Sequence, residues 1–281
     1  MNAKRKLIGK MPVIFILLLV LDGAAIPKLI NDAAFFSMDK NTKKSSMFRE
    51  QQLTEELVRY MQKGKEPARE AGIYLLEKNM RNHMMSPPFS EKKFLDLEQQ
   101  WNKNPCYTDY KASCESIWSD VEYFPVMFSS TDDTLTVSYE DSWMNERTYG
   151  GKRGHEGTDI MASQNERGLY PVVSMTDGTV TSRGWLPKGG WRIGITSEHG
   201  GYFYYAHLDS YGDAKIGDKV EAGDIIGYMG DSGYGEKGTV GKFPVHLHLG
   251  IYLEEPGEEI SINPYWILKY IENSKLKCSY S

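Results

Sequence analysis

The chain has 281 residues, of which 40% are hydrophobic and 25% are charged, as in an ordinary soluble globular protein. This length allows one large domain or two modest ones with a proper hydrophobic core. The formal net charge of -5 argues against nucleic acid as a partner, because there is no basic surplus to neutralise phosphates.

The first 30 residues have the layout of a secretory signal peptide or a membrane anchor. Basic residues, among them Lys4 and Lys10, precede an apolar run at residues 13–21. The run is shorter than the roughly 20 residues that span a bilayer, and the small residues at 23–25 suit a signal peptidase. We therefore expect export, either by secretion or to the outer face of the cytoplasmic membrane. A cleaved signal and a retained anchor both stay open.

A polar stretch of small side chains at residues 37–46 predicts a flexible segment, and we place a linker at residues 31–47. Such a linker would separate a membrane-directed segment from the first packed helix. We therefore expect residues 1–48 to determine where the protein works and to contribute nothing to its chemistry.

Residues 48–125 have the apolar spacing of helices. Gly64 and Pro67 separate two predicted helices, and Ser90 is placed to cap a third. A further helix is expected at about residues 112–121. The apolar residues of this region are most simply a hydrophobic core, and we assign them no chemistry.

The three cysteines do not form a disulfide framework. Cys106 and Cys114 could pair outside the membrane, but a continuous helix through both would hold their Cα atoms about 12 Å apart, too far for a bridge. Pro105 and Asp109 allow a break in such a helix without requiring one.

From residue 126 onward, frequent glycines and short alternating runs predict an antiparallel β-domain over residues 126–281. Strand-like runs lie at residues 134–139, 179–181, 192–196 and 202–205. Residues 217–227 have the pattern of a strand-turn-strand unit, and residues 265–271 that of a terminal helix. The expected fold class is α+β, with a small N-terminal helical segment followed by the antiparallel β-domain.

One predicted strand near the C-terminus alternates apolar residues with His246 and His248, so that both imidazoles share one face. His155 and Asp159 are four residues apart and also share a face if they lie on a strand. His207 lies between these two motifs in the sequence. These residues together point to a metal site.

A histidine and an aspartate completed by one further histidine give three protein ligands and an open fourth position, the pattern of a catalytic zinc site. Zinc bound in this way lowers the pKa of its water to about 7 and polarises a carbonyl group. The remaining histidines could supply acid–base help. The cysteines are too scattered to form a competing thiolate site.

Three motifs, in this order, resemble the signature of the lysostaphin-type (LytM-like) zinc metalloendopeptidases of bacterial cell walls: His155-x-x-x-Asp159, Tyr205-Ala206-His207-Leu208 and Val245-His246-Leu247-His248. The resemblance implies that His155, Asp159 and His248 bind the zinc. It also implies that His207 and His246 orient the water and stabilise the tetrahedral intermediate.

The resemblance covers about residues 140–268 and implies a β-domain of the hybrid-barrel type, with residues 217–227 as a hairpin. It further implies an endopeptidase that cuts the peptide cross-links of peptidoglycan, whose peptide stems or cross-bridges are its partners. Glycyl bridges and D-alanyl–diamino acid links are both cut within the family, so the link stays open.

Two other functions are weighed against this one. A cupin-like metal enzyme also carries two histidines on a strand, but a cupin places its further ligands downstream, whereas His155 and His207 lie upstream. A non-catalytic envelope scaffold, which regulates other cell-wall hydrolases, could use the same groove. Scaffolds of this kind usually lose ligands, and this chain keeps all five motif residues.

Some polar residues near the motifs are assigned other roles. Glu156 has an odd offset from His155, so we expect it to face away and to be structural. His199 is expected in a turn. Arg147, Arg153 and Tyr205 are candidates for contact with the substrate.

Overall fold

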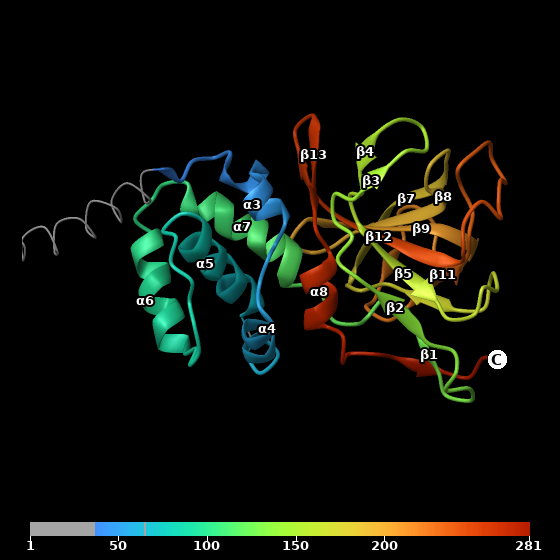
Figure 1. Cartoon of the computed structure of the whole chain (residues 1–281), viewed down its shortest axis with the longest axis horizontal. Coiled ribbons are helices and arrows are strands. Elements are labelled where there is room, and N and C mark those ends of the chain that lie inside the picture. The colour runs from blue at the N-terminus through green and yellow to red at the C-terminus, as the bar shows by residue number, and fades with distance from the viewer. Residues whose placement is uncertain (1–36, 65) are drawn as a thin grey trace, which may run out of the picture.

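The computed structural model describes residues 37–64 and 66–281. The predicted signal or anchor at residues 1–30 lies outside the described residues. Helices gather at one end of the molecule and strands at the other (Figure 1), which gives the α+β architecture expected from the sequence. Among the described residues, no helix is long and apolar enough to cross a membrane.

The helical region is built from short helices that pack around a common core. In chain order they are η1 (Thr42–Lys44), α3 (Ser46–Arg49), α4 (Glu55–Met61), α5 (Pro67–Asn79), α6 (Glu91–Trp101) and α7 (Tyr107–Trp118). Pro67 begins α5, and the Ser90 hydroxyl accepts a hydrogen bond from the Lys93 amide at the start of α6, as the sequence predicts. Trp101 and Trp118 are fully buried, so the helical spacing does mark a core.

Helix α7 begins earlier than expected and excludes a disulfide between its cysteines. It runs from Tyr107 to Trp118 rather than over residues 112–121, with Cys106 at its N-cap and Cys114 inside it. A continuous helix holds the two Cα atoms too far apart for a bridge. Both thiols are free, and burial raises the pKa of Cys114 to about 12.

Residues 37–47 differ from the flexible linker that the sequence predicts. Met38 and Lys43 are buried, and the Lys43 ammonium forms ion pairs with Asp109 of α7, at 3.0 Å, and with Glu255 of the β-domain. Polar composition is misleading here, because the aliphatic stem of a lysine packs against apolar surface while its ammonium meets distant carboxylates. For the described residues, the expected separation of this segment from the β-domain is wrong.

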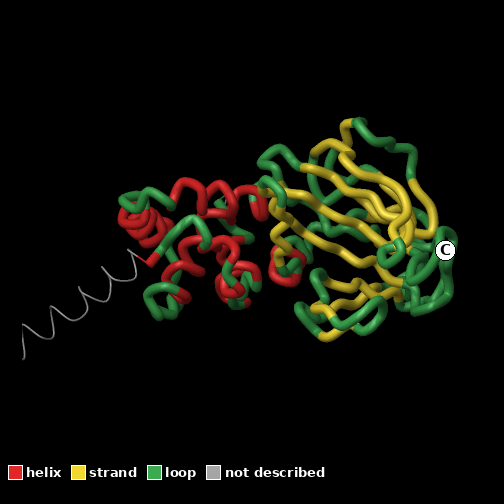
Figure 2. Tube along the Cα trace, turned by 90° about the horizontal axis from the view of Figure 1, so that it is seen from above, coloured by secondary structure: helices red, strands yellow, loops and turns green. Residues whose placement is uncertain are grey.

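Arg49 at the end of α3 joins the helical region to the sheet. Its guanidinium donates to the carbonyl and hydroxyl oxygens of Ser261 and to the carboxylate of Glu156, and its own carbonyl accepts from the Asn263 amide. Helix α8 (Tyr265–Tyr270), the terminal helix expected from the sequence, packs against α4. Figure 2 shows the helices on one side of the sheet.

The β-domain contains one large sheet, which has ten strands within the described residues. Its strands are β2 (Val137–Tyr139), β5 (Thr158–Ala162), β6 (Pro171–Val173), β7 (Gly178–Leu186), β8 (Gly190–Thr196), β9 (Gly201–Tyr211), β10 (Lys219–Val220), β11 (Ile225–Met229), β12 (His246–Glu255) and β13 (Glu258–Ile262). The strand order is β10-β7-β8-β9-β12-β5-β2, with β13 on β12 and β11 between β9 and β6. Two small pairs complete the domain: β1 (Phe128–Ser129) with β14 (Lys277–Cys278), and β3 (Glu146–Arg147) with β4 (Arg153–Gly154).

The strand-turn-strand unit at residues 217–227 is present, but it is not a hairpin. Asp224 closes its turn by accepting a hydrogen bond from the Glu221 amide. Strand β10 nevertheless pairs with β7, and β11 pairs with β6 and β9. The turn therefore connects different parts of the sheet.

Strand β12 lies between β9 and β5 and supplies both core and surface. Leu247, Leu249 and Ile251 are fully buried, and His246 and His248 alternate with them on the opposite face. The alternation predicted for this strand is confirmed. Polar side chains of β9 and β5 on the same face come within reach of the two histidines.

Candidate metal centre and active site

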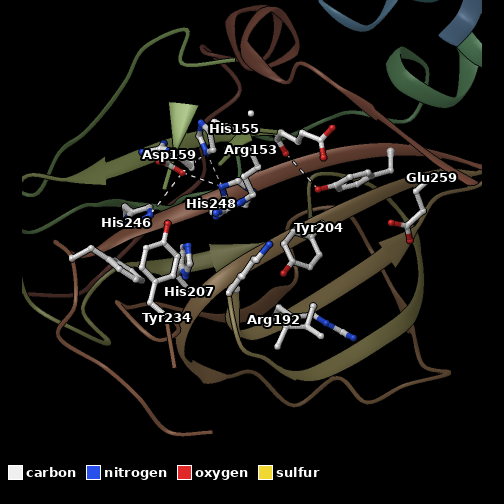
Figure 3. Close-up of a pocket in the computed structure, with 18 of the residues that line it drawn as sticks. Arg153, His155, Asp159, Arg192, Tyr204, His207, Tyr234, His246, His248 and Glu259 are labelled. Carbon is white, nitrogen blue, oxygen red and sulfur yellow. Dashed lines mark hydrogen bonds and ion pairs between the residues drawn. The ribbon is translucent and has the colours of Figure 1, made fainter. Parts of the chain in front are cut away.

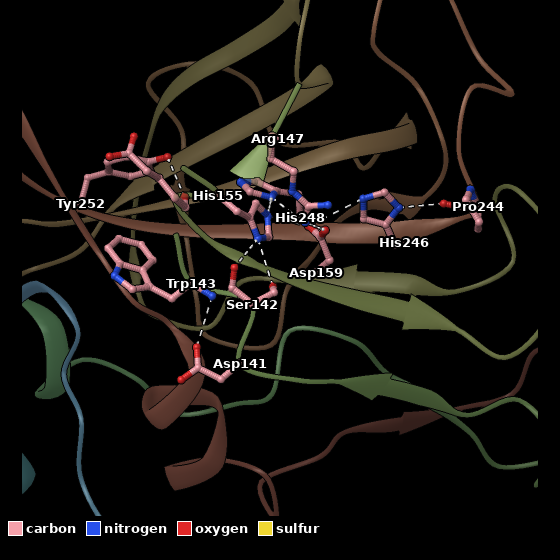
Figure 4. Close-up of polar contacts among 11 residues, drawn as sticks. Asp141, Ser142, Trp143, Arg147, His155, Asp159, Pro244, His246, His248 and Tyr252 are labelled. Carbon is pink, nitrogen blue, oxygen red and sulfur yellow. Dashed lines mark hydrogen bonds and ion pairs between the residues drawn. The ribbon is translucent and has the colours of Figure 1, made fainter. Parts of the chain in front are cut away.

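Three side chains converge over the sheet: His155, Asp159 and His248 (Figure 4). Nε2 of His155 lies 3.1 Å from Oδ1 of Asp159 and 3.0 Å from Nδ1 of His248. Nδ1 of His248 lies 3.0 Å from the same Oδ1. Within the described part of the chain, this is the one group of three or more His, Cys, Asp or Glu side chains whose donor atoms all lie within 4.8 Å of one another.

The register of the sheet brings Asp159 and His248 together. Strand β5 pairs with β12 so that Asp159 stands directly opposite His248. Residues at opposed positions of an antiparallel pair project from the same face, with Cβ atoms about 4.5–5.5 Å apart. The pairing of these two predicted ligands therefore follows from strand alternation alone.

His155 reaches the same point from outside the sheet. It precedes β5, so the prediction that it shares a strand face with Asp159 is wrong, although the two side chains meet. Its Nδ1 lies 3.0 Å from the Ser142 hydroxyl and 3.3 Å from the Ser142 carbonyl oxygen. Because a carbonyl oxygen only accepts, the proton belongs on Nδ1 and Nε2 presents its lone pair. Gly157 leaves the necessary space, since a Cβ there would lie 2.5 Å from Cε1 of His248.

The carboxylate of Asp159 is held as an anion. Burial by itself would raise its pKa, but the imidazoles of His155 and His248 beside it outweigh burial and bring the pKa well below its usual range. Nη2 of Arg147 lies 2.6 Å from Oδ2, which leaves Oδ1 for the common point. Burial lowers the pKa of His155, so its imidazole is neutral, as a metal ligand must be.

This donor set fits a zinc ion. Two imidazole nitrogens and one carboxylate oxygen are ligands of a catalytic zinc site, which keeps its fourth position open. Donor atoms about 2.0–2.1 Å from a tetrahedral ion lie about 3.3 Å apart. The separations of 3.0–3.1 Å found here are close to that value. Three lone pairs aimed at one point repel one another unless a cation or a proton lies between them.

His207 reaches the site through an irregularity in β9. Strict alternation would put Tyr205 and His207 on one face, and Tyr205 is fully buried in the core. His207 instead has a left-handed backbone, with φ of 62°, beside shifts in pairing register. Leu208 therefore takes the next core position, and the His207 ring lies 4.8 Å from the His246 ring, centroid to centroid.

His207 and His246 are oriented in the same way. Nδ1 of His207 donates to the Ser232 carbonyl oxygen, and Nδ1 of His246 to that of Pro244, both at 2.7 Å. Each Nε2 is thereby left unprotonated, and that of His246 lies 3.7 Å from Oδ1 of Asp159. Burial lowers the pKa of both rings, that of His207 well below its ordinary value, so both are neutral at pH 7.

The same face continues as an open pocket of about 460 Å³ with a floor of tyrosines (Figure 3). The Tyr204 ring meets His248 edge-on, with centroids 6.2 Å apart, and lies 6.2 Å from the Tyr252 ring. Gly250 stands opposite Tyr204 in the register of β9 and β12 and leaves room for the rings. Aromatic rings beside the convergent donor atoms offer apolar surface for the side chains and backbone of a peptide.

The tyrosine that faces the pocket is not the one that the sequence suggests. The expected contact between Tyr205 and the substrate is wrong, because Tyr205 is buried and its hydroxyl accepts from the Met175 amide. The preceding residue, Tyr204, lines the pocket instead. Arg147 and Arg153, the other two candidates for contact with the substrate, also line the pocket. The Arg147 guanidinium donates a hydrogen bond to the Asp159 carboxylate.

Glu156 and His199 have structural contacts. The Glu156 carboxylate accepts from Arg49 and from the Ser261 hydroxyl. Glu156 precedes β5 and lines the pocket, so the expectation that it faces away is wrong, whereas these two contacts agree with a structural role. His199 stands in a turn, with Nδ1 2.6 Å from Oδ1 of Asp120.

Known families match both parts of the chain. Residues 33–120 match the LytM N-terminal domain, and residues 153–264 match peptidase family M23. A crystal structure of a candidate glycyl-glycine endopeptidase LytM from Ruminococcus gnavus ATCC 29149 is 54% identical, with a TM-score of 0.83. That likeness covers 89% of this chain and 99% of the other.

Curated relatives match the C-terminal part. The L-Ala–D-Glu endopeptidase of Bacillus subtilis is 48% identical over 129 residues, 46% of this chain and 38% of that protein. Lysostaphin of Staphylococcus simulans is 39% identical over 111 residues, 35% of this chain and 22% of that protein. The chain thus spans less than two fifths of the length of these two relatives. The resemblance found in the sequence is confirmed: the chain belongs to peptidase family M23, a family of metallopeptidases, and carries a LytM N-terminal domain before the peptidase region.

Proposed function

We propose that this protein is a zinc-dependent endopeptidase that hydrolyses peptide links of bacterial peptidoglycan. One observation carries the proposal: the convergent atoms of His155, Asp159 and His248 stand beside two buried, neutral histidines on the same face of one pocket. Relatives named as endopeptidases, among them lysostaphin and a glycyl-glycine endopeptidase, support it.

We assign the zinc to His155, Asp159 and His248, and the proton transfers to His207 and His246. Zinc bound there supplies a Lewis acid that polarises the scissile carbonyl and acidifies a water. The neutral His207 and His246 can each accept a proton on Nε2 and return it to the leaving nitrogen. In the protonated form, either ring can also donate a hydrogen bond to the developing oxyanion.

The names of the relatives divide between two kinds of link. One relative is an L-Ala–D-Glu endopeptidase, whose link contains an acidic residue, and another is a glycyl-glycine endopeptidase, whose link contains none. Both kinds are peptide bonds of the cell wall, and an open pocket of about 460 Å³ has the size of a site for a short peptide. We therefore propose peptidoglycan peptides as the substrate class, either stems or cross-bridges.

We propose that the protein acts outside the cytoplasmic membrane, with residues 1–30 as an export signal or an anchor. We also propose a helical domain at residues 48–125 and a catalytic β-domain at residues 126–281. The alternative function is a non-catalytic envelope scaffold. Binding alone does not require two neutral, oriented histidines beside a metal site, so their presence favours the enzyme.

The test uses the purified protein on purified cell walls. We expect about one zinc per chain, release of new amino groups from the walls, loss of that release on chelation, and its recovery when zinc is restored. Full zinc occupancy without any release of amino groups would contradict the enzyme and favour the scaffold.

A further inference from the structure

We propose that Arg192, in a pocket that Arg153 and Lys188 also line, forms a subsite for a carboxylate of the substrate. The substrate is then an acidic peptide whose carboxylate lies within about two residues of the scissile bond. This inference rests on the proposed peptidase function and narrows its substrate class.

The first support is the unsatisfied guanidinium of Arg192. The residue is half-buried on β8 and lines the same pocket as His248 and Tyr204. Its Nε and Nη1 are buried and find no hydrogen-bond partner among the described residues. Burying guanidinium nitrogens without acceptors costs free energy, and a ligand carboxylate that accepts from the guanidinium recovers part of it.

The second support is the charge of the pocket, which is opposite to that of the whole chain. The chain has a formal net charge of -5. The pocket is nevertheless lined by four cationic residues, Arg147, Arg153, Lys188 and Arg192, and by three acidic ones, Glu156, Asp159 and Glu259. Two of these acids are engaged, since Glu156 accepts from Arg49 and Asp159 belongs to the metal site. Glu259 is exposed. A local surplus of cations in an acidic protein selects an anionic ligand.

The third support is the position of Arg192 relative to the proposed metal. Strands β8, β9 and β12 are consecutive in the sheet, so the backbones at Arg192 and His248 are about two strand spacings, or roughly 10 Å, apart. Figure 3 shows Tyr204 between His248 and Arg192. The arginine side chain spans part of this distance, and an extended peptide covers the rest at about 3.3–3.6 Å per residue. The carboxylate therefore belongs to a residue close to the scissile bond.

The guanidinium is also suited to this ligand by its geometry. Arginine presents a planar fork of donors that matches the two oxygens of a carboxylate. Arg153, which lines the same pocket, donates to the Tyr149 carbonyl rather than to a carboxylate, so its charge is available to attract an anion. A neutral glycyl peptide offers these cations no anionic group, whereas an acidic peptide does.

The test compares two peptides that differ at one group. One peptide has a glutamyl carboxylate next to the scissile bond, and the other has the carboxamide at the same atom. The zinc-loaded wild type should prefer the acid by about 10- to 100-fold in kcat/KM and in the Kd of non-cleavable analogues. Arg192→Gln should abolish the preference by lowering the kcat/KM of the acid peptide far more than that of the amide peptide, and it should lower the salt dependence of acid binding.

A matched control is available on the neighbouring strand. Arg183 of β7 stacks on the Tyr211 ring, 4.0 Å from its centroid, and does not line the pocket. Arg183→Gln removes the same charge and should keep the preference for the acid. Arg192→Lys keeps the charge without the fork and should restore part of the preference. If Arg192→Gln folds poorly, as judged by zinc content and melting temperature, two other variants test the subsite. Arg192→Lys and the double variant Arg153→Gln/Lys188→Gln should each reduce the preference for the acid peptide.

Each outcome either supports or contradicts the carboxylate subsite at Arg192. An unchanged preference in Arg192→Gln would mean that the zinc or another group holds the carboxylate, and the subsite would be wrong. Equal losses on both peptides would assign Arg192 to the reaction in general and would also overturn the subsite. A wild type that cleaves neither peptide, but binds the acid in an Arg192-dependent way, would keep the subsite and contradict the peptidase function.

Discussion

The helical region and the face of the sheet bury polar side chains in different ways. In the helical region, the Glu77 carboxylate accepts hydrogen bonds from Arg81 and Trp101 and is thereby satisfied inside the protein. On the sheet, Nδ1 of His207 and Nδ1 of His246 each donate a hydrogen bond to a backbone carbonyl oxygen. Both residues line the pocket, and Nε2 of each ring is left unprotonated. Buried polar groups are normally paired, so a ring nitrogen that is left without a protein partner and lines a pocket marks a candidate functional group.

The two regions also respond to pH in opposite directions. Burial raises the pKa of Glu70 in α5 to about 7, and its Oε2 has no hydrogen-bond partner among the described residues. Such a carboxyl contributes stability below its unfolded pKa, and the contribution is lost as pH rises towards 7. Burial lowers the pKa of His207, so the contribution of this ring to the stability of the metal-free protein is full above about pH 6.5 and is lost as pH falls below that value.

The largest effect should follow loss of a ligand on the sheet. His248→Ala removes one of three donors that meet within 3.1 Å, so zinc and hydrolysis should both be lost. His199→Ala is the matched control, because that histidine lies in a turn and pairs with Asp120. Metal analysis and wall digestion measure both variants. Full zinc in His248→Ala would overturn the ligand assignment.

A smaller loss should separate chemistry from metal binding. His207→Gln and His246→Gln remove a proton-accepting nitrogen but none of the three convergent donors, so zinc should stay bound while the rate falls by about 10²–10⁴. Rates on wall fragments, with zinc content measured on the same samples, check this. A variant that turns over at the wild-type rate would have no catalytic histidine at that position, and one that loses zinc would belong to the ligands.

The parts of the site that could be predicted from sequence are those governed by strand alternation. His248 stands opposite Asp159 and alternates with the buried Leu247 and Leu249, as a period of two requires. The antiparallel pairing of the large sheet follows from the same short-range pattern. Local signals also sufficed for the Ser90 cap of α6.

The remaining parts depend on contacts between distant residues. The left-handed backbone of His207 reverses the alternation within β9, which is why Tyr204 rather than Tyr205 faces the pocket. A positive φ at a histidine has no signature in composition or periodicity. Similarly, Lys43 can be buried because its ammonium forms ion pairs with Asp109 and Glu255, which lie far along the chain.

The junction between the two regions offers an effect of intermediate size. Arg49→Ala removes the bonds to Ser261 and Glu156, so the free energy of unfolding should fall by about 1–3 kcal/mol. Arg59→Ala is the control, since its pairs with Glu55 and Glu56 are exposed and should contribute less than about 0.5 kcal/mol. Urea unfolding measures both. Equal midpoints for Arg49→Ala and the wild type would support a helical region that is separable from the sheet.

The smallest effect should reveal the opposed pH responses. Glu70→Gln replaces a buried carboxyl by a neutral group of the same shape, so nothing has to be ionised as pH rises. At pH 8 the variant should be more stable than the wild type by about 1–2 kcal/mol, less than the full 1.4 kcal/mol per pKa unit because water relaxes around a buried charge. Near pH 4.5 the two should be equal, since the wild-type carboxyl is protonated there in the folded state.

Metal-free His207→Gln should give the opposite result, with a gain in stability over the wild type only below about pH 6.5, where the unfolded histidine binds a proton that the buried ring does not. Melting temperatures of metal-free protein between pH 4.5 and 8 measure both variants, because zinc binding would add its own pH dependence. Parallel pH profiles for Glu70→Gln and the wild type would show that Glu70 ionises normally in the folded protein, and the contrast between the two regions would then rest on the histidines alone.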